Sequence, residues 1–148
     1  MTKYFFNLYF QYNENVEQEE FSSVFNLGYF SSYKKAKETI QLYAGKPGFK
    51  EFDEQCFKIQ KFGVKFDNEN IDKTKVILYE LSHVFTDSDG ITEEILFGVY
   101  STMLMAKAML TKQKKKRSFK GKTEGFHIAK WRVDVDLAWE EGFDSDNQ

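Results

Sequence analysis

Three side chains have the chemistry for nucleophilic catalysis or transition-metal binding: the single cysteine, Cys56, and two histidines, His83 and His127. A zinc or nucleophilic site needs several such groups close together, whereas these three lie in separate segments. His127 stands between Phe126 and Ile128, so alternation along a strand turns it away from them, towards solvent. We therefore expect no catalytic, cofactor-binding or metal-ligating residue and no enzymatic activity, with Cys56 as a buried free thiol.

Two glycine-containing loops resemble ligand-binding loops in part. Asp87-Ser88-Asp89-Gly90 resembles the start of a calcium loop, but the glycine comes too early and no glutamate stands at the twelfth position. Gly45-Lys46-Pro47-Gly48 lacks the spacing of a phosphate loop and follows a predicted helix rather than a strand. We interpret the first as a hairpin turn and the second as a helix end.

Charge is segregated towards the C-terminus, although the formal net charge is only −2. The stretch 103–133 carries ten basic residues and one acid, Glu124. The run Lys112–Lys122 could bind phosphates, which makes a nucleic-acid-binding module the alternative function. A solvated helix end, where the dipole favours lysine, explains the same run without a ligand.

The stretch from 134 to the C-terminus has six acids and no base, interleaved with aromatic side chains. An aromatic ringed by carboxylates suits a basic protein surface, because it combines an apolar anchor with charge steering. We expect Trp139 and Phe143 to share one face of a helical turn and the carboxylates to remain in solvent. The predicted partner-binding residues are Asp134, Asp136, Trp139, Glu140, Glu141, Asp144 and Asp146. The alternative is that Trp139 and Phe143 simply dock the tail onto the sheet, which is compatible with partner binding.

Length and composition predict one globular domain, or two very small ones. The chain has 148 residues, of which 41% are hydrophobic and 30% charged, so disorder is excluded and no apolar stretch is long enough to span a membrane. A single cysteine excludes an internal disulfide. No secretory signal is evident after Met1, and we expect a cytoplasmic location.

The chain resembles itself when shifted by 70 residues. Gly28 falls on Gly98, Ala36-Lys37 on Ala106-Lys107, and Leu8-Tyr9 on Leu78-Tyr79. The pairs run in order along nearly the whole of each half, which indicates a duplication. The predicted repeats are residues 1–70 and 71–148, the second ending in the acidic tail, and together they are expected to form one compact domain.

Each half predicts the order strand–strand–helix–strand. The strands are expected at 4–12, 21–30 and 56–66, and at 76–85, 91–100 and 125–135. Serine or threonine caps precede both helices, and the second helix is expected to run longer. Ile40 and Leu110, related by the shift of 70, should pack against the sheets. The fold class is therefore α+β, with about six mainly antiparallel strands and two helices.

The motifs resemble an uncharacterised family of small bacterial domains. They are Gly28-Tyr29-Phe30-Ser31 and Gly98-Val99-Tyr100-Ser101 before each helix, and Trp139-Glu140-Glu141-Gly142-Phe143 at the end of the second half. Only the second half has the closing motif. The resemblance implies no catalytic residues.

In its small size, aromatic richness, segregated charge and lack of a catalytic motif, the chain is similar to immunity proteins, which neutralise bacterial toxins. The similarity implies a toxin inhibitor whose partner is a basic toxin domain, such as a nuclease. An enzyme of unrecognised type is the third reading.

Overall fold

The computed structural model describes residues 1–16 and 19–144, and within them the side chains outside 14–22. It has an α+β fold with six strands and two helices, as the sequence predicts. The elements are β1 (Thr2–Val16), β2 (Glu19–Phe30), α1 (Tyr33–Ala44), β3 (Phe57–Lys65), β4 (Ile77–Thr86), β5 (Thr92–Tyr100), α2 (Met103–Lys114) and β6 (Phe126–Arg132). Short 3₁₀ turns lie between them, at Phe49–Glu51, Glu54–Cys56, Lys73–Lys75, Arg117–Phe119 and Thr123–Gly125.

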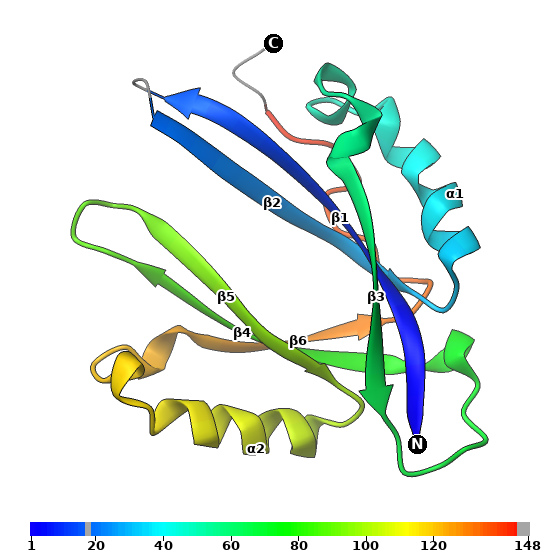
Figure 1. The fold of residues 1–148 in the computed structure, drawn as a ribbon, viewed down its shortest axis with the longest axis vertical. Coiled ribbons are helices and arrows are strands. Elements are labelled where there is room, and N and C mark those ends of the chain that lie inside the picture. Colours follow the sequence, from blue (N-terminus) through cyan, green and yellow to red (C-terminus); the bar gives the residue numbers. More distant parts are fainter. Residues whose placement is uncertain (17–18, 145–148) are drawn as a thin grey trace. The chain divides into compact units, whose positions relative to one another are not determined.

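The strands form two three-stranded sheets, in the orders β2-β1-β3 and β5-β4-β6. Each sheet places its third strand beside its first, with one helix following the hairpin (Figure 1). The chain divides into two compact units, which we call the first unit (1–2 and 64–132) and the second unit (3–63 and 133–148). These units do not have the bounds of the predicted repeats, 1–70 and 71–148, and the duplication itself stays a prediction from the sequence.

The two hairpins share a register and an irregularity. Leu8 lies opposite Gly28 and Leu81 opposite Gly98, and in each hairpin the register shifts at the next pair. The structure therefore matches Leu8 with Leu81, and the sequence match of Leu8 with Leu78 is wrong for the first strands. From Gly28 and Gly98 onwards the spacing of 70 holds, because both helices begin five residues after the glycine.

Local sequence explains where the helices begin. Ser32 caps α1 by accepting a hydrogen bond from the Lys35 N–H, and Thr102 caps α2 by accepting one from Met105. Both helices have 12 residues, so the prediction of a longer second helix is wrong. The lysines that follow α2 continue into a 3₁₀ turn, Arg117–Phe119.

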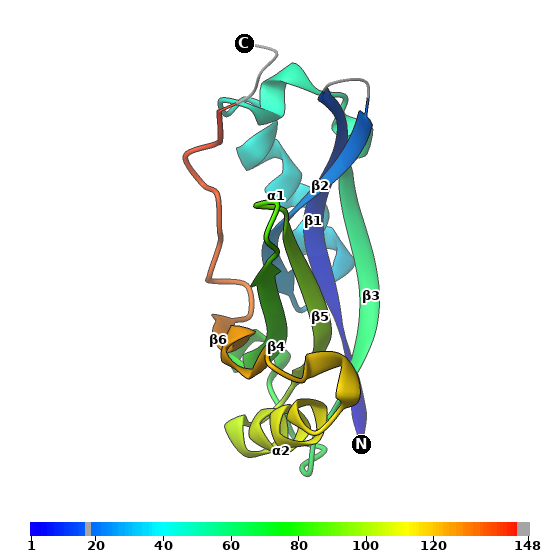
Figure 2. The same ribbon diagram turned by 90° about the vertical axis from the view of Figure 1, so that its left-hand side faces the viewer.

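The core of the second unit is aromatic and lies between α1 and its sheet. Phe10 is fully buried, and its ring centroid lies 4.9 Å from those of both Phe49 and Phe57. Ile40 is half-buried against this cluster. Figure 2 gives a second view of α1 beside the three strands. T-shaped aromatic pairs of this kind add to the stabilisation from burial alone.

The core of the first unit is smaller, with Leu81, Phe119 and Phe126 at its centre. Leu110 is half-buried against it, which agrees with the predicted helix phase. The last strand, β6, ends at Arg132, three residues before its predicted end. The chain then turns at Val133–Val135 and returns to the second unit.

Candidate binding surface around the C-terminal segment

Residues 133–144, here called the tail segment, lie along β2 and α1 of the second unit (Figure 1). The Asp134 N–H donates to the Tyr29 carbonyl and the Ala138 N–H to the Leu27 carbonyl, each at 2.9 Å. Between them Leu137 forms an antiparallel bridge with Gly28. The tail segment therefore covers the outer edge of β2 at Leu27–Tyr29, which would otherwise be open to pairing with another chain.

Asp134 fastens the start of the tail segment to the beginning of α1. Its Oδ1 accepts from the Ser31 N–H at 2.9 Å, and its Oδ2 from the Ser31 Oγ at 2.7 Å and the Lys35 Nζ at 3.1 Å. Its side chain is only 13% exposed. The backbone of Asp134 is left-handed, with φ of 65°, a conformation that Asp and Asn tolerate better than most residues. The expectation that this carboxylate stays in solvent is wrong.

Tyr43 of α1 holds the middle of the tail segment. Its hydroxyl donates to the Ala138 carbonyl at 2.6 Å, and its ring is almost fully buried. Burial, and secondarily the negative charge of Glu140, raise the pKa of Tyr43 well above its usual range. The phenol therefore remains a protonated donor at neutral pH.

Trp139 and Phe143 anchor the far end of the tail segment on one aromatic surface. Trp139 stacks on Phe25 with ring centroids 4.3 Å apart and planes at 16°. Phe143 meets the same Phe25 ring edge-on at 4.8 Å and also packs on Tyr12. Both anchor rings thus contact Phe25, but the predicted helical turn is wrong, because Trp139 is left-handed with φ of 59°.

The turn between the two anchors is closed by glycine and proline backbone. The Gly142 N–H donates to the Trp139 carbonyl at 3.0 Å, and the Phe143 N–H to the Pro47 carbonyl at 2.9 Å. Gly142 has φ of 90°, and a Cβ there would collide with the Pro47 carbonyl oxygen. The sequence requires glycine here for both its conformation and its lack of a side chain.

Some of the predicted partner-binding residues are buried or bonded within the second unit, and others are exposed to solvent. Asp134 is engaged within the unit, and Asp136 is half-buried. Glu140, Glu141 and Asp144 are exposed, and Trp139 keeps 47% of its surface exposed despite its stacking. Asp146 lies outside the described residues. We call Trp139, Glu140, Glu141 and Asp144 the acidic turn.

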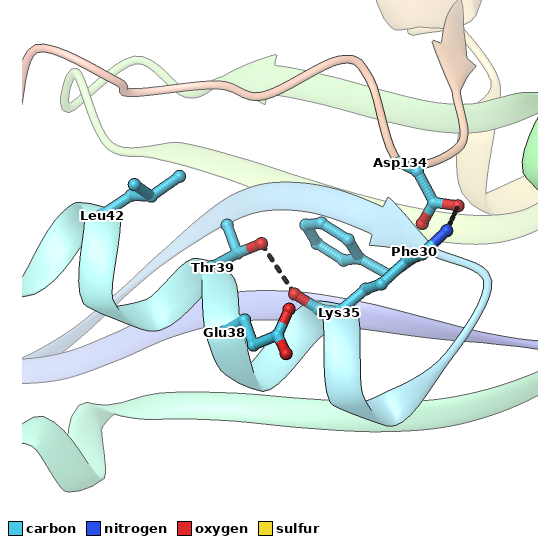
Figure 3. Close-up of a pocket in the computed structure, with 6 residues that line it drawn as sticks. All are labelled: Phe30, Lys35, Glu38, Thr39, Leu42 and Asp134. Carbon is cyan, nitrogen blue, oxygen red and sulfur yellow. Dashed lines mark hydrogen bonds and ion pairs between the residues drawn. The ribbon is translucent and has the colours of Figure 1, made fainter.

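A shallow groove of about 420 Å³ lies beside the tail segment. Figure 3 shows Asp134 paired with Lys35, and Leu42 two turns further along α1. The Thr39 hydroxyl donates to the Lys35 carbonyl at 2.7 Å, so it contributes little polarity to the groove. Its lining is Phe30, Lys35, Glu38, Thr39, Leu42 and Asp134. No pattern in the sequence indicates this groove, because two segments far apart in the chain line it.

The three candidate catalytic side chains occupy structural or isolated positions. His83 is buried between Phe119 and Phe126, and its Nε2–H donates to the Lys122 carbonyl at 2.7 Å. His127 is exposed.

Cys56 is half-buried. Burial, and then Asp53, raise the pKa of its thiol above the ordinary value, while Lys58 opposes them. A raised pKa keeps the group a thiol and disfavours nucleophilic attack.

Within the part of the chain that the structure describes, no three His, Cys, Asp or Glu side chains cluster as metal ligands do. Its helices include none with the length and apolar composition needed to cross a membrane. No family model, curated protein or solved structure matches the chain.

Proposed function

We propose that this chain is a non-enzymatic protein-binding protein of the immunity type. It would neutralise a basic toxin domain, such as a nuclease, by covering that domain's active surface. The acidic turn supports this proposal most directly. It presents a half-exposed tryptophan, held in place by Phe25, beside three exposed carboxylates.

The rigid setting of the acidic turn favours binding. Trp139 is already stacked on Phe25 and Phe143 is already hydrogen-bonded to Pro47, so little conformational entropy remains to be lost on association. Aromatic side chains of this kind often dominate interface energies, while nearby charges steer the encounter. The buried setting of His83 and the raised pKa of Cys56 support binding rather than catalysis.

The first experiment asks whether a toxin exists for this chain to neutralise. Each gene next to the one that encodes this chain is expressed in a bacterial host, alone and together with the chain. We expect one product to arrest growth alone and to form a stable complex that restores growth. If no neighbouring product is toxic, or if growth recovers without a complex, the proposal fails.

The second experiment tests the acidic turn against the identified toxin. A variant with Glu140→Gln, Glu141→Gln and Asp144→Asn removes three exposed charges from the turn. The matched control, with Glu51→Gln, Asp67→Asn and Glu69→Gln, removes three exposed charges elsewhere. The turn variant should associate about tenfold more slowly at low salt, and the difference should shrink once the screening length falls to about 8 Å. Equal rates for both variants would remove the turn from the interface.

The alternative function is nucleic-acid binding through the run Lys112–Lys122. All seven basic side chains of this run are exposed, and among the described residues no carboxylate forms an ion pair with them. Phosphate binding by such a run weakens steeply with salt. Tight, salt-dependent binding to a single-stranded RNA, lost on Lys115→Glu and Lys116→Glu, would favour this alternative.

A further inference from the structure

The two units present equivalent surfaces, of which only one is covered. Because Gly28 and Gly98 hold the same register position before each helix, positions 22–30 of β2 and all of α1 have counterparts 70 residues later on β5 and α2. The tail segment covers the surface on β2 and α1. Among the described residues no segment pairs with β5 on the side away from β4.

The backbone of β5 is arranged like that of β2. In the second unit the carbonyls of Leu27 and Tyr29 accept hydrogen bonds from the tail segment. Their counterparts are Phe97 and Val99, whose carbonyls we expect to face the open edge because the two hairpins share a register. An exposed edge of this kind can accept an extended segment as an additional strand.

The side chains around this edge are apolar and exposed. Ile95, the counterpart of the Phe25 that Trp139 covers, is 45% exposed, and its neighbour Leu96 is 53% exposed. On α2, Met105 replaces the Lys35 of α1 and is 37% exposed, while Leu104 is 80% exposed. Exposed apolar side chains beside an open edge are available to pack against the side chains of an added strand.

Two polar side chains of the first unit, Gln113 and Ser101, correspond to side chains of the second unit that form hydrogen bonds with the tail segment. Gln113 holds the position of Tyr43, the hydroxyl of which reaches the tail segment. Gln113 is 92% buried, since only 8% of its surface is exposed, and no donor among the described residues reaches its Oε1. Ser101 holds the position of Ser31, yet among the described residues its hydroxyl donates only to the Met105 sulfur, at 3.4 Å. A buried acceptor without a donor is costly, which favours a ligand that supplies one.

The charge around the surface selects an acidic ligand. Helix α2 carries three lysines and no acid, and Lys112 stands where Leu42 lines the groove of the second unit. Acids on this surface are confined to Glu93 and Glu94, at the start of β5. A bound segment should therefore have a carboxylate near Ser101 and an apolar residue near Ile95, just as the tail segment has Asp134 at Ser31 and Trp139 at Phe25.

We propose that the open edge of β5, together with α2, binds an extended acidic segment of a partner protein as an added antiparallel strand. One carboxylate of that segment binds the N–H and hydroxyl of Ser101, as Asp134 binds Ser31. The segment's backbone pairs with Phe97 and Val99. This surface is distinct from the acidic turn and has the opposite charge, so the inference goes beyond the proposed function.

The test uses the full chain and a synthetic peptide with the sequence of residues 133–144 as probe. Backbone amide NMR signals are followed during titration, and affinity is measured by fluorescence anisotropy. We expect saturable binding, with the largest shifts at Phe97, Val99 and Ser101. A peptide with lysine in place of each acid should not bind. The variant Lys107→Glu/Lys112→Glu should bind the probe about tenfold more weakly, from two reversed charges. The control Lys50→Glu/Lys58→Glu, exposed on the second unit, should bind normally.

Several results would overturn the proposal. The first is that the probe does not bind saturably. The second is that NMR shifts are confined to residues 27–31, which would show that the probe exchanges with the chain's own tail segment. Equal effects of both lysine variants would show non-specific attraction. An RNA oligonucleotide that shifts the same amides more strongly than the peptide would identify a nucleic-acid site instead. Val99→Pro removes an N–H at the open edge and leaves the hydrogen bonds to β4 in place. It should abolish binding of the probe, while the remaining amide signals stay those of the folded chain.

Discussion

Asp134 binds Ser31 through both carboxylate oxygens, across 103 positions of sequence. The bond to the Ser31 hydroxyl is 2.7 Å long and the bond to its N–H is 2.9 Å long. Charge-assisted hydrogen bonds of this length are among the stronger ones in proteins. This contact joins the start of the tail segment to the end of β2 and so fixes where the segment lies.

Asp134→Asn should destabilise the second unit by about 2 kcal/mol, because it weakens two charge-assisted hydrogen bonds and removes the ion pair with Lys35. Asn tolerates the left-handed backbone, so the change reports on the charge rather than on strain. Chemical denaturation measures the effect. The exposed control Asp144→Asn should stay within about 0.5 kcal/mol of the parent chain, and an equally small effect at Asp134 would show that the contact is dispensable.

Gly142→Ala should release the end of the tail segment, because the new Cβ collides with the Pro47 carbonyl. The matched control is Gly121→Ala, which also has positive φ, at 79°, but no atom within 4 Å of the new Cβ. The control loses about 1 kcal/mol for its conformation alone. Limited proteolysis should cleave the Gly142 variant within 139–144 several times faster than the control, and equal cleavage would contradict the proposed collision.

Stability should fall with rising pH above about pH 10, in part because of Tyr43. Burial raises the folded-state pKa of Tyr43 above its unfolded value, so its contribution is fully present below the unfolded pKa and is lost as the pH rises towards the folded one. A single group of this kind contributes a slope of up to about 1.4 kcal/mol per pH unit. Tyr43→Phe should lower stability at neutral pH but flatten this slope. Parallel curves for variant and parent, measured by urea denaturation, would refute the assignment.

Cys56 should react with iodoacetamide at pH 8 more slowly than a free cysteine, because burial and Asp53 raise the pKa of its thiol. Asp53→Asn removes one of these causes, so it should raise the rate, while Lys58→Gln should lower it. Mass spectrometry of the alkylated chain gives both rates. A thiol that reacts as fast as free cysteine would mean that Cys56 is activated and would reopen a catalytic reading.

Local sequence determined the order and type of the elements. Alternating aromatic residues specify the strands, and Ser32 and Thr102 specify the helix starts, because these signals act between residues a few positions apart. The same signals predicted strands in the first hairpin that are shorter than those observed. Asn13 looks like a loop residue but pairs with Ser22 in a strand, because ladder hydrogen bonds override weak local preference.

The candidate site depended on tertiary structure. The acidic residues and Trp139 stand out in the sequence, yet nothing local distinguishes Asp134, which is bonded inside the unit, from Glu140, which faces solvent. That difference arises because the chain turns after β6 and brings Asp134 to Ser31, a contact between segments about 100 residues apart. The open edge of β5 likewise cannot be predicted from the sequence. Phe97 and Leu27 are both apolar strand residues, and they differ only because the tail segment pairs with β2 and no described segment pairs with the outer edge of β5. Sequence determines which residues can pair, and only the path of the folded chain decides which of them do.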